Sequence, residues 1–150
     1  MAATYELAIA TSATGAAAPS LEICAITKPA SILELEIANT AATAASLSVG
    51  RPGNTPTTGT QVTATLPINR PPGGQVSTTN LIIAGWGTAP TVPAAGHTHR
   101  KIGLPATIGV GWLGVWAPKE MMLDPTRSGS LIIWNVSAIG VLNVRVKWEE

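Results

Sequence analysis

The chain has 150 residues and a formal net charge of +1, and only 11% of its residues are charged, compared with roughly 25% in ordinary soluble domains. A compact monomer of this size exposes about 7,000 Å² and would carry about half the usual density of charge on it. Because neither sign of charge is clustered, the composition argues against electrostatic binding of nucleic acid or of an anionic membrane. Such a surface suits a subunit that packs against neighbours better than an isolated enzyme.

The simplest organisation at this length is one domain, residues 1–150, with a core of its own. A single cysteine excludes an internal disulfide framework. The first residues lack the basic flank and long apolar run of a signal peptide, and no apolar stretch reaches membrane-spanning length. We therefore expect synthesis and assembly in a reducing cytoplasm. With five Trp, one Tyr and no Phe, tryptophan must supply most of the large-volume packing.

Alternation of apolar and polar residues predicts strands throughout the first half of the chain. The clearest is residues 33–37, where Leu33, Leu35 and Ile37 alternate with two glutamates. Pro67 indicates an edge position or a strand end for the last of these segments. The predicted strands are residues 5–9, 21–25, 33–37, 47–49 and 62–68.

The second half predicts four further strands, residues 81–86, 107–116, 131–136 and 142–148. Four large apolar residues of the second of these share one face: Ile108, Val110, Trp112 and Trp116. Residues 131–136 are apolar on both faces, as in a central strand. In the last segment, Leu142, Val144, Val146 and Trp148 lie on one side. Residues 137–140 are predicted to be the hairpin turn between the last two strands.

No ten-residue window shows a convincing helical stripe, and the alanine-rich residues 39–45 lack large apolar side chains that would anchor a helix. Turn-rich segments lie at residues 51–56, 71–74 and 89–96. Eight or nine short strands joined in this way predict an all-β fold, an antiparallel β-sandwich in a single domain. Long Gly/Pro-rich loops near the middle favour a jelly-roll-like arrangement over an immunoglobulin-like one, because Greek-key crossovers need such loops.

The pair His97 and His99 is the one part of the sequence that looks like metal ligands. In an extended backbone both imidazoles face the same way, as a cupin-type site requires. Such a site needs a further histidine and a carboxylate, and the chain has no other histidine. A polar loop before a strand, or a site completed by copies of the chain on a threefold axis, are the other interpretations. We expect no metal and no cofactor.

Catalytic signatures are also missing. Cys24 lies in mid-strand without a local His or Asn, which is typical of a small packing residue. Residues 109–114 match the spacing G-x-G-x-x-G but lie inside a predicted strand and precede no helix, so they fail as a nucleotide site. Glu34 and Glu36 belong on the solvent side of one strand. We expect a protein that is not an enzyme.

Three stretches carry a family resemblance. They are residues 47–52, residues 85–93 followed by 100–109, and the closing residues 129–135 with 146–150. In these stretches the chain resembles the capsid decoration (cement) proteins of tailed bacteriophages, small virion structural proteins with jelly-roll-like β folds. The resemblance implies multimers, often trimers, seated on the major capsid shell. It supplies no binding residues to transfer to this chain.

We therefore expect a decoration protein of the virion that binds the outer surface of the assembled head and stabilises it. Its expected partners are the major capsid protein and copies of itself in a homotrimer, with no nucleic acid and no membrane. Five basic residues in predicted loops are candidates for contacts with acidic patches of these partners: Arg51, Arg70, Arg100, Lys101 and Arg127. Simple solubility is the other interpretation of these residues.

Two alternatives remain open at this point. A carbohydrate- or host-binding module on a tail or head fibre predicts at least one tryptophan exposed on a concave face. The inward phase of Trp112, Trp116 and Trp148 favours core packing instead. A cupin-like metalloprotein predicts a bound metal at His97 and His99.

Overall fold

The computed structural model describes residues 4–11, 15, 18–25, 27–54, 58–61, 68–69, 81–86, 97–126, 129–137 and 140–150. Within them the chain forms β-strands and no α-helix, so no helix among these residues is long and apolar enough to cross a membrane. The strands are β1 (Thr4–Ala10), β2 (Pro19–Ala25), β3 (Ala30–Asn39), β4 (Ala45–Gly50), β5 (Thr58–Gln61), β6 (Ile68–Asn69), β7 (Leu81–Trp86), β8 (Thr98–Leu104), β9 (Gly111–Val115), β10 (Met122–Leu123), β11 (Leu131–Asn135) and β12 (Leu142–Glu149).

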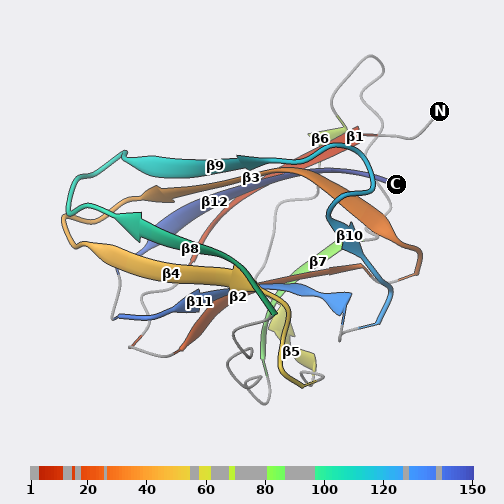
Figure 1. The fold of residues 1–150 in the computed structure, drawn as a ribbon, viewed down its shortest axis with the longest axis horizontal. Helices are drawn as coiled ribbons and strands as arrows, with labels where there is room; N and C mark the ends of the chain where they lie inside the picture. The colour runs from red at the N-terminus through yellow and green to blue at the C-terminus, as the bar shows by residue number, and fades with distance from the viewer. Residues whose placement is uncertain are drawn as a thin grey trace.

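The strands form two antiparallel sheets. Sheet 1 has the order β10-β3-β12-β1-β6, and β9 pairs with the same edge of β3 as β10, further along the strand. Sheet 2 has the order β5-β7-β2-β11-β4-β8. Figure 1 shows the two sheets as separate layers, with β9, β3 and β12 in one and β8, β4, β11 and β2 in the other. The all-β, antiparallel prediction is confirmed.

Four antiparallel pairs are nested in the sequence around the segment that joins β4 to β8. β4 pairs with β8 in sheet 2, and β3 pairs with β9 in sheet 1. Outside these, β2 pairs with β11 in sheet 2, and β1 pairs with β12 in sheet 1. The chain therefore crosses between the sheets at most of its connections, and strands that are far apart in sequence become neighbours.

The core lies between the layers and takes every second side chain from each sheet. Sheet 1 contributes Leu35, Ile37, Val144, Val146 and Trp148, and sheet 2 contributes Leu21, Ile23, Leu47, Leu131 and Ile133. The predicted inward side of residues 142–148 is confirmed. Trp148 stacks on Tyr5 with ring centroids 5.5 Å apart, so one of the five tryptophans anchors the pairing of β12 with β1.

The phase predicted for β3 is wrong at its start. The register places Lys147 opposite Glu34 but Trp148 opposite Ile32, so Leu33 is an extra residue in a β-bulge. Ile32 is fully buried in the core, whereas Leu33 is only half-buried. The bulge shifts the inward face by one residue, a change that alternation in a single strand cannot reveal.

The predicted hairpin at residues 137–140 is also wrong. β11 belongs to sheet 2, where β2 and β4 occupy both of its edges, so β12 cannot pair with it. The connection instead crosses to sheet 1, where β12 lies between β3 and β1. The predicted central strand is confirmed for residues 131–135, because β11 lies between β2 and β4 and is buried on both faces; Val136, which follows it, is exposed.

The strand predicted at residues 107–116 is shorter in the structure. It begins at Gly111, after a turn in which the Gly109 nitrogen donates to the Asn39 oxygen at 2.8 Å. Gly109 has a φ of 84°, in the region that favours glycine, and this turn ends the extended backbone. The prediction that Ile108 and Val110 share the inward face of Trp112 and Trp116 is therefore wrong, and both side chains are exposed.

The strand β8 was not predicted. Arg100 and Lys101, expected in a loop, lie within it, because Ile102 and Leu104 alternate inward and extend the backbone past the polar residues before them. Residues 62–67 of the predicted strand 62–68 lie outside the described residues. The turn-rich segments 71–74 and 89–96 lie entirely outside them.

Candidate interaction surface

The outer face of sheet 1 is the most distinctive surface of the described part of the chain. Its side chains alternate with those of the core, and the register arranges them in rows across β9, β3, β12 and β1. The first row is Gly111, Ala38, Asn143 and Ala10; the second is Leu113, Glu36, Arg145 and Ala8; the third is Val115, Glu34, Lys147 and Glu6. Each strand thus contributes a column of one character: β9 apolar, β3 acidic, β12 basic, and β1 small at its Ala8–Ala10 end.

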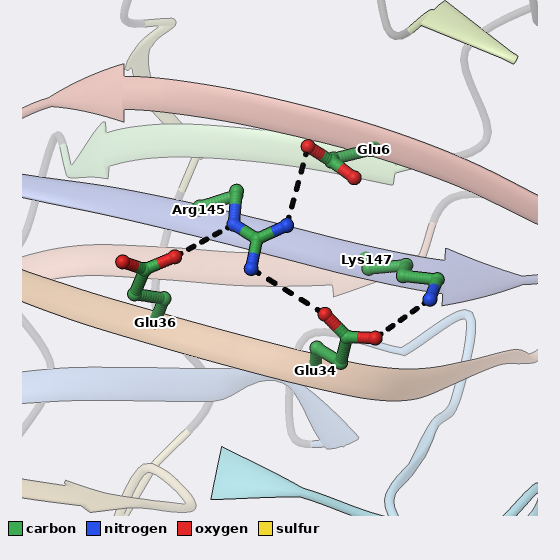
Figure 2. A network of polar contacts seen from close by, with 5 residues as sticks. All are labelled: Glu6, Glu34, Glu36, Arg145 and Lys147. Atoms are coloured by element: carbon green, nitrogen blue, oxygen red, sulfur yellow. Dashed lines mark hydrogen bonds and ion pairs between the residues drawn. The ribbon is translucent and has the colours of Figure 1, made fainter. Parts of the chain in front are cut away.

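The two middle columns form an ion-pair network, and Glu6 of β1 joins it (Figure 2). Arg145 Nε donates to Glu36 Oε2 at 2.7 Å, and Lys147 Nζ lies 2.6 Å from Glu34 Oε1. Arg145 also lies 3.4 Å from Glu6 Oε1 and 3.5 Å from Glu34 Oε2. The hydrogen bond to Glu36 is the main cause that raises the pKa of Arg145; partial burial opposes this and Glu6 adds to it. The network holds three strands of the sheet in register.

An open hollow of about 360 Å³ lies beside the network. Its lining is small or aliphatic apart from three polar side chains: Ala8, Ile9, Ala10, Glu36, Ala38, Asn143, Val144 and Arg145. The hollow exists because alanines occupy the first and second rows on β1 and the first row on β3, where larger side chains would fill the space above the sheet. It offers an apolar floor with charged groups at one side.

The apolar strip is defined as Ile108 and Val110, in the turn that precedes β9, together with Leu113 and Val115 on β9, at the border of the same face. The exposed fractions of these side chains are 67%, 37%, 52% and 66%, respectively. β9 pairs with β3 on one side, and no strand among the described residues pairs with its other side. An apolar edge strand with unpaired backbone groups is prone to pair with another chain. The strip is therefore a surface that a partner is expected to cover.

Two tryptophans hold the strip in place from the inner side. Trp112 and Trp116 pack against the core, and their rings meet edge to face at a centroid distance of 6.3 Å. Gly114 lies between them, where a Cβ atom would come within 2.7 Å of the Trp116 ring and closer still to Trp112. The predicted core role of both tryptophans is confirmed, and the alternation that places them inward places Leu113 and Val115 outward.

Buried Asn39 fixes the turn that carries Ile108. Its side-chain Nδ2 donates to the carbonyl oxygens of Thr43 at 2.6 Å and Pro105 at 3.0 Å. Its backbone nitrogen donates to the Val110 oxygen at 2.9 Å. One residue at the end of β3 thus ties together two loops, a role that the sequence analysis missed.

Arg51 is engaged within its own chain. Its Nη1 donates to the carbonyl oxygen of Gly129, and its Nη2 donates to that of Met122 at 2.5 Å. Burial lowers the pKa of Arg51, and the charge of Asp124 opposes this. These bonds satisfy carbonyl groups around β10, so the side chain fastens that segment to the start of the loop after β4.

The other basic candidates differ from Arg51. Arg100 and Lys101 are exposed on β8, and Arg100 lines a second hollow with Trp112 and Trp116. Arg70 and Arg127 lie outside the described residues. Among the three candidates within the described residues, Arg100 is the one that lines a hollow together with Leu113 and Val115 of the apolar strip.

His97 and His99 are both exposed, on either side of Thr98 at the start of β8. Burial lowers the pKa of His99 below its ordinary value of 6.5, and the charges of Arg51 and His97 lower it further. Among the described residues, no three His, Cys, Asp or Glu side chains come together in a way that could hold a metal ion. A third protein ligand for a cupin-like site is thus not found in that part of the chain. Cys24 is buried in β2.

Sequence reasoning missed the ion-pair network and the outward position of Leu113 and Val115. The alternation in residues 33–37 and 142–148 already placed Glu34, Glu36, Arg145 and Lys147 on polar faces. It did not indicate that β3 and β12 are neighbours, which the long-range register decides. For β9, the inward phase of Trp112 was a usable signal for the outward phase of Leu113.

Comparisons with protein-family models, with curated proteins and with solved structures find no match to this chain.

Proposed function

We propose that this chain is a decoration, or cement, protein of a tailed-phage virion, which binds the outer surface of the assembled head as a homotrimer and stabilises it without catalysis. The observation that carries the proposal is the apolar strip, four exposed aliphatic side chains on edge strand β9 and in the turn before it, in a chain with few charges. A protein with such an edge needs partners that cover it. The family resemblance of residues 47–52, of 85–93 with 100–109, and of 129–135 with 146–150 supplies the kind of partner.

We also propose that the two sheets form a jelly roll. The nested pairs β4–β8, β3–β9, β2–β11 and β1–β12 support this, because they alternate between the two sheets. A long antiparallel ribbon that wraps around a core produces such a pattern, and the double-sheet jelly roll with two Greek keys is its common form.

The stabilising action would follow from mass action. A subunit that contacts several capsid proteins binds the assembled shell and not its separated parts, so its binding free energy opposes disassembly. Aliphatic side chains such as Ile108 and Val110, in the turn before β9, lose little side-chain entropy on binding. Many shallow contacts of this kind suit a shell that is under internal pressure.

The test uses heads that lack this chain, prepared from the phage that encodes it. We expect the purified chain to co-sediment with these heads and to raise the temperature at which they release DNA. Ile108→Asp should weaken the binding at least tenfold, because it places a charge at the tip of the apolar strip. Val136→Asp is the matched control, since Val136 is 56% exposed but follows β11 of sheet 2 and is not part of the strip.

Failure of the chain to bind these heads would overturn the proposal. If a glycan quenches the tryptophan fluorescence while heads do not bind, the chain is a carbohydrate-binding module. If the purified chain carries a stoichiometric metal that is lost in His97→Ala, it is a metalloprotein.

A further inference from the structure

We propose that a second copy of this chain packs face to face on the outer face of sheet 1, about a two-fold axis that runs parallel to the strands between β3 and β12. This two-fold contact is separate from the contacts that would form the proposed homotrimer. It rests on the proposed function in one respect, that the chain acts as part of an assembly. It names the occupant of the β9 side of that face.

The two middle columns of the face, on β3 and β12, are complementary in charge when their order is reversed. β3 carries Glu34 and Glu36, and its neighbour β12 carries Lys147 and Arg145 in the same rows. A two-fold axis between these strands exchanges the two columns and keeps each row at its own level. Glu36 then faces Arg145 of the second copy, and Glu34 faces its Lys147. Figure 2 shows both columns on the same face, with Glu6 beyond them on β1.

The outer columns are complementary in size under the same rotation. β9 and β1 exchange places, so exposed Leu113 comes opposite Ala8 of the second copy, in the second row. Ala8, Ala10 and Ala38 line the hollow of about 360 Å³, which has room for a leucine side chain. By symmetry the hollow of the first copy receives Leu113 of the second. In this isologous contact the Leu113 side chain of each copy therefore fills the hollow of the other copy.

The position of these columns selects a half-turn. The apolar column and the hollow lie on one face of one sheet, so a surface that contacts either of them must face back toward it. In the proposed contact each copy places its apolar column in the hollow of the other copy. Two copies that use the same patch in this reciprocal way are related by a rotation of 180°, and not by the 120° of a threefold ring. Two sheets that face each other also pack well when their strand directions lie within about 30° of each other, as this axis requires.

Pairing of β9 with β9 of another copy is the main rival. It also covers the apolar strip, because antiparallel edge strands can add to each other. However, it leaves the alanine hollow empty and uses neither charged column. The two arrangements bring different residues together: Leu113 meets Ala8 in the face-to-face contact, and β9 residues meet β9 residues in the edge contact.

The test is cysteine cross-linking of the purified chain in the absence of heads. Leu113→Cys and Ala8→Cys are both at exposed positions, and the native Cys24 is buried. We expect an equimolar mixture of the two single variants to form a disulfide-linked dimer under mild oxidation. We expect each single variant alone to stay mostly monomeric on a non-reducing gel. Within one copy, three strand spacings of about 4.8 Å separate the two columns, too far for an internal disulfide.

Sedimentation equilibrium of the chain without added cysteines provides a second measurement. We expect Leu113→Asp to raise the dissociation constant of the two-fold contact at least tenfold, with an unchanged unfolding transition. Val136→Asp should leave that constant unchanged, since Val136 lies outside sheet 1. Raising the salt concentration should weaken the contact, because the facing charges are screened.

Three results would overturn the inference. The first is cross-linking of Leu113→Cys with itself at least as fast as with Ala8→Cys, which would indicate the edge pairing. The second is a lack of cross-linking in the mixture at concentrations where the wild-type chain associates. The third is an association constant that Leu113→Asp leaves unchanged. All of these are measured without heads, so they leave the test of head binding independent.

Discussion

The outer faces of the two sheets differ sharply in burial. On sheet 1 the outward side chains of β9, β3, β12 and β1 are exposed or half-buried. In β2, β11 and β4 of sheet 2 the following side chains that alternate with the core are almost fully buried: Glu22, Cys24, Ser48, Ile132 and Trp134. Alternation places both sets away from the core, yet only the set on sheet 1 reaches solvent. The middle of sheet 2 is thus buried on both faces, although Lys101 on its edge strand β8 is exposed, and sheet 1 has a face left for a partner.

The chemistry of the two faces agrees with this difference. β11, at the centre of sheet 2, has Ile132 and Trp134 on its outward side, where an exposed strand would carry polar residues. β12, at the centre of sheet 1, has Arg145 and Lys147 in the equivalent places and pairs them with glutamates of β3. A charged network between exposed strands keeps that face wet in the isolated chain and still allows it to meet a complementary face.

The largest effect is expected from the buried outward face of sheet 2. Trp134→Ala removes a side chain that is 1% exposed and leaves a cavity, so the free energy of unfolding should fall by about 3–5 kcal/mol. Chemical denaturation followed by far-UV circular dichroism measures the loss. Val115→Ala on the exposed face of sheet 1 is the comparison, with an expected change of less than about 0.5 kcal/mol. Equal losses in the two variants would contradict the distinction between the faces.

A smaller loss is expected where β9 meets the core. In Gly114→Ala, the added Cβ would lie 2.7 Å from the Trp116 ring, which forces one of the two tryptophans to move. The free energy of unfolding should fall by about 1–3 kcal/mol, and the near-UV circular dichroism of the tryptophans should change. Gly103→Ala in β8 is the matched control, because a Cβ there meets nothing within 4 Å. If Gly103→Ala destabilises the chain as much, crowding at the tryptophans is not the cause.

The ion-pair network of sheet 1 should contribute less. Arg145→Met removes three ion pairs and keeps most of the aliphatic side chain. Since the arginine side chain is 30% exposed, solvent screens these pairs, and we expect a loss of about 1 kcal/mol or less in dilute solution. The loss should shrink at high salt. Lys101→Met on β8 is the control, and a salt-independent loss in Arg145→Met would point to packing instead.

The smallest effect concerns His99, beside the edge of sheet 2. Because burial lowers the pKa of His99 below 6.5 in the folded chain, the unfolded chain binds more protons as the pH falls below that value. Stability from this group is therefore full above about pH 6.5 and declines as the pH falls through the folded pKa. Thermal unfolding of His99→Gln between pH 7.5 and 5 should show a flatter pH dependence than wild type. A steeper or an identical profile would contradict this assignment.

Much of the fold was predictable because alternation is a local signal. Leu142, Val144, Val146 and Trp148 were placed on one side by their spacing alone, and all four are buried. The apolar character of residues 131–135 on both faces indicated a central strand, which β11 is. The candidate site was predicted less well, because its parts lie on four strands that are neighbours only in space. Among the basic candidates that the structure describes, Arg100 lies beside the apolar strip, and Arg51 binds carbonyl groups of its own chain.

The amino-acid sequence by itself determined the class of the fold, the low charge of the surface and the inward or outward phase within most strands, since these depend on composition and on a period of two residues. Only the tertiary structure decided the bulge at Leu33, the crossing between sheets after β11 and the exposure of Ile108. Each of these depends on which strands compete for an edge, and hydrogen bonds between residues far apart in the chain settle that competition. The acidic column on β3 and the basic column on β12 lie side by side in one chain for the same reason, because the register of β3 against β12 places Glu36 next to Arg145.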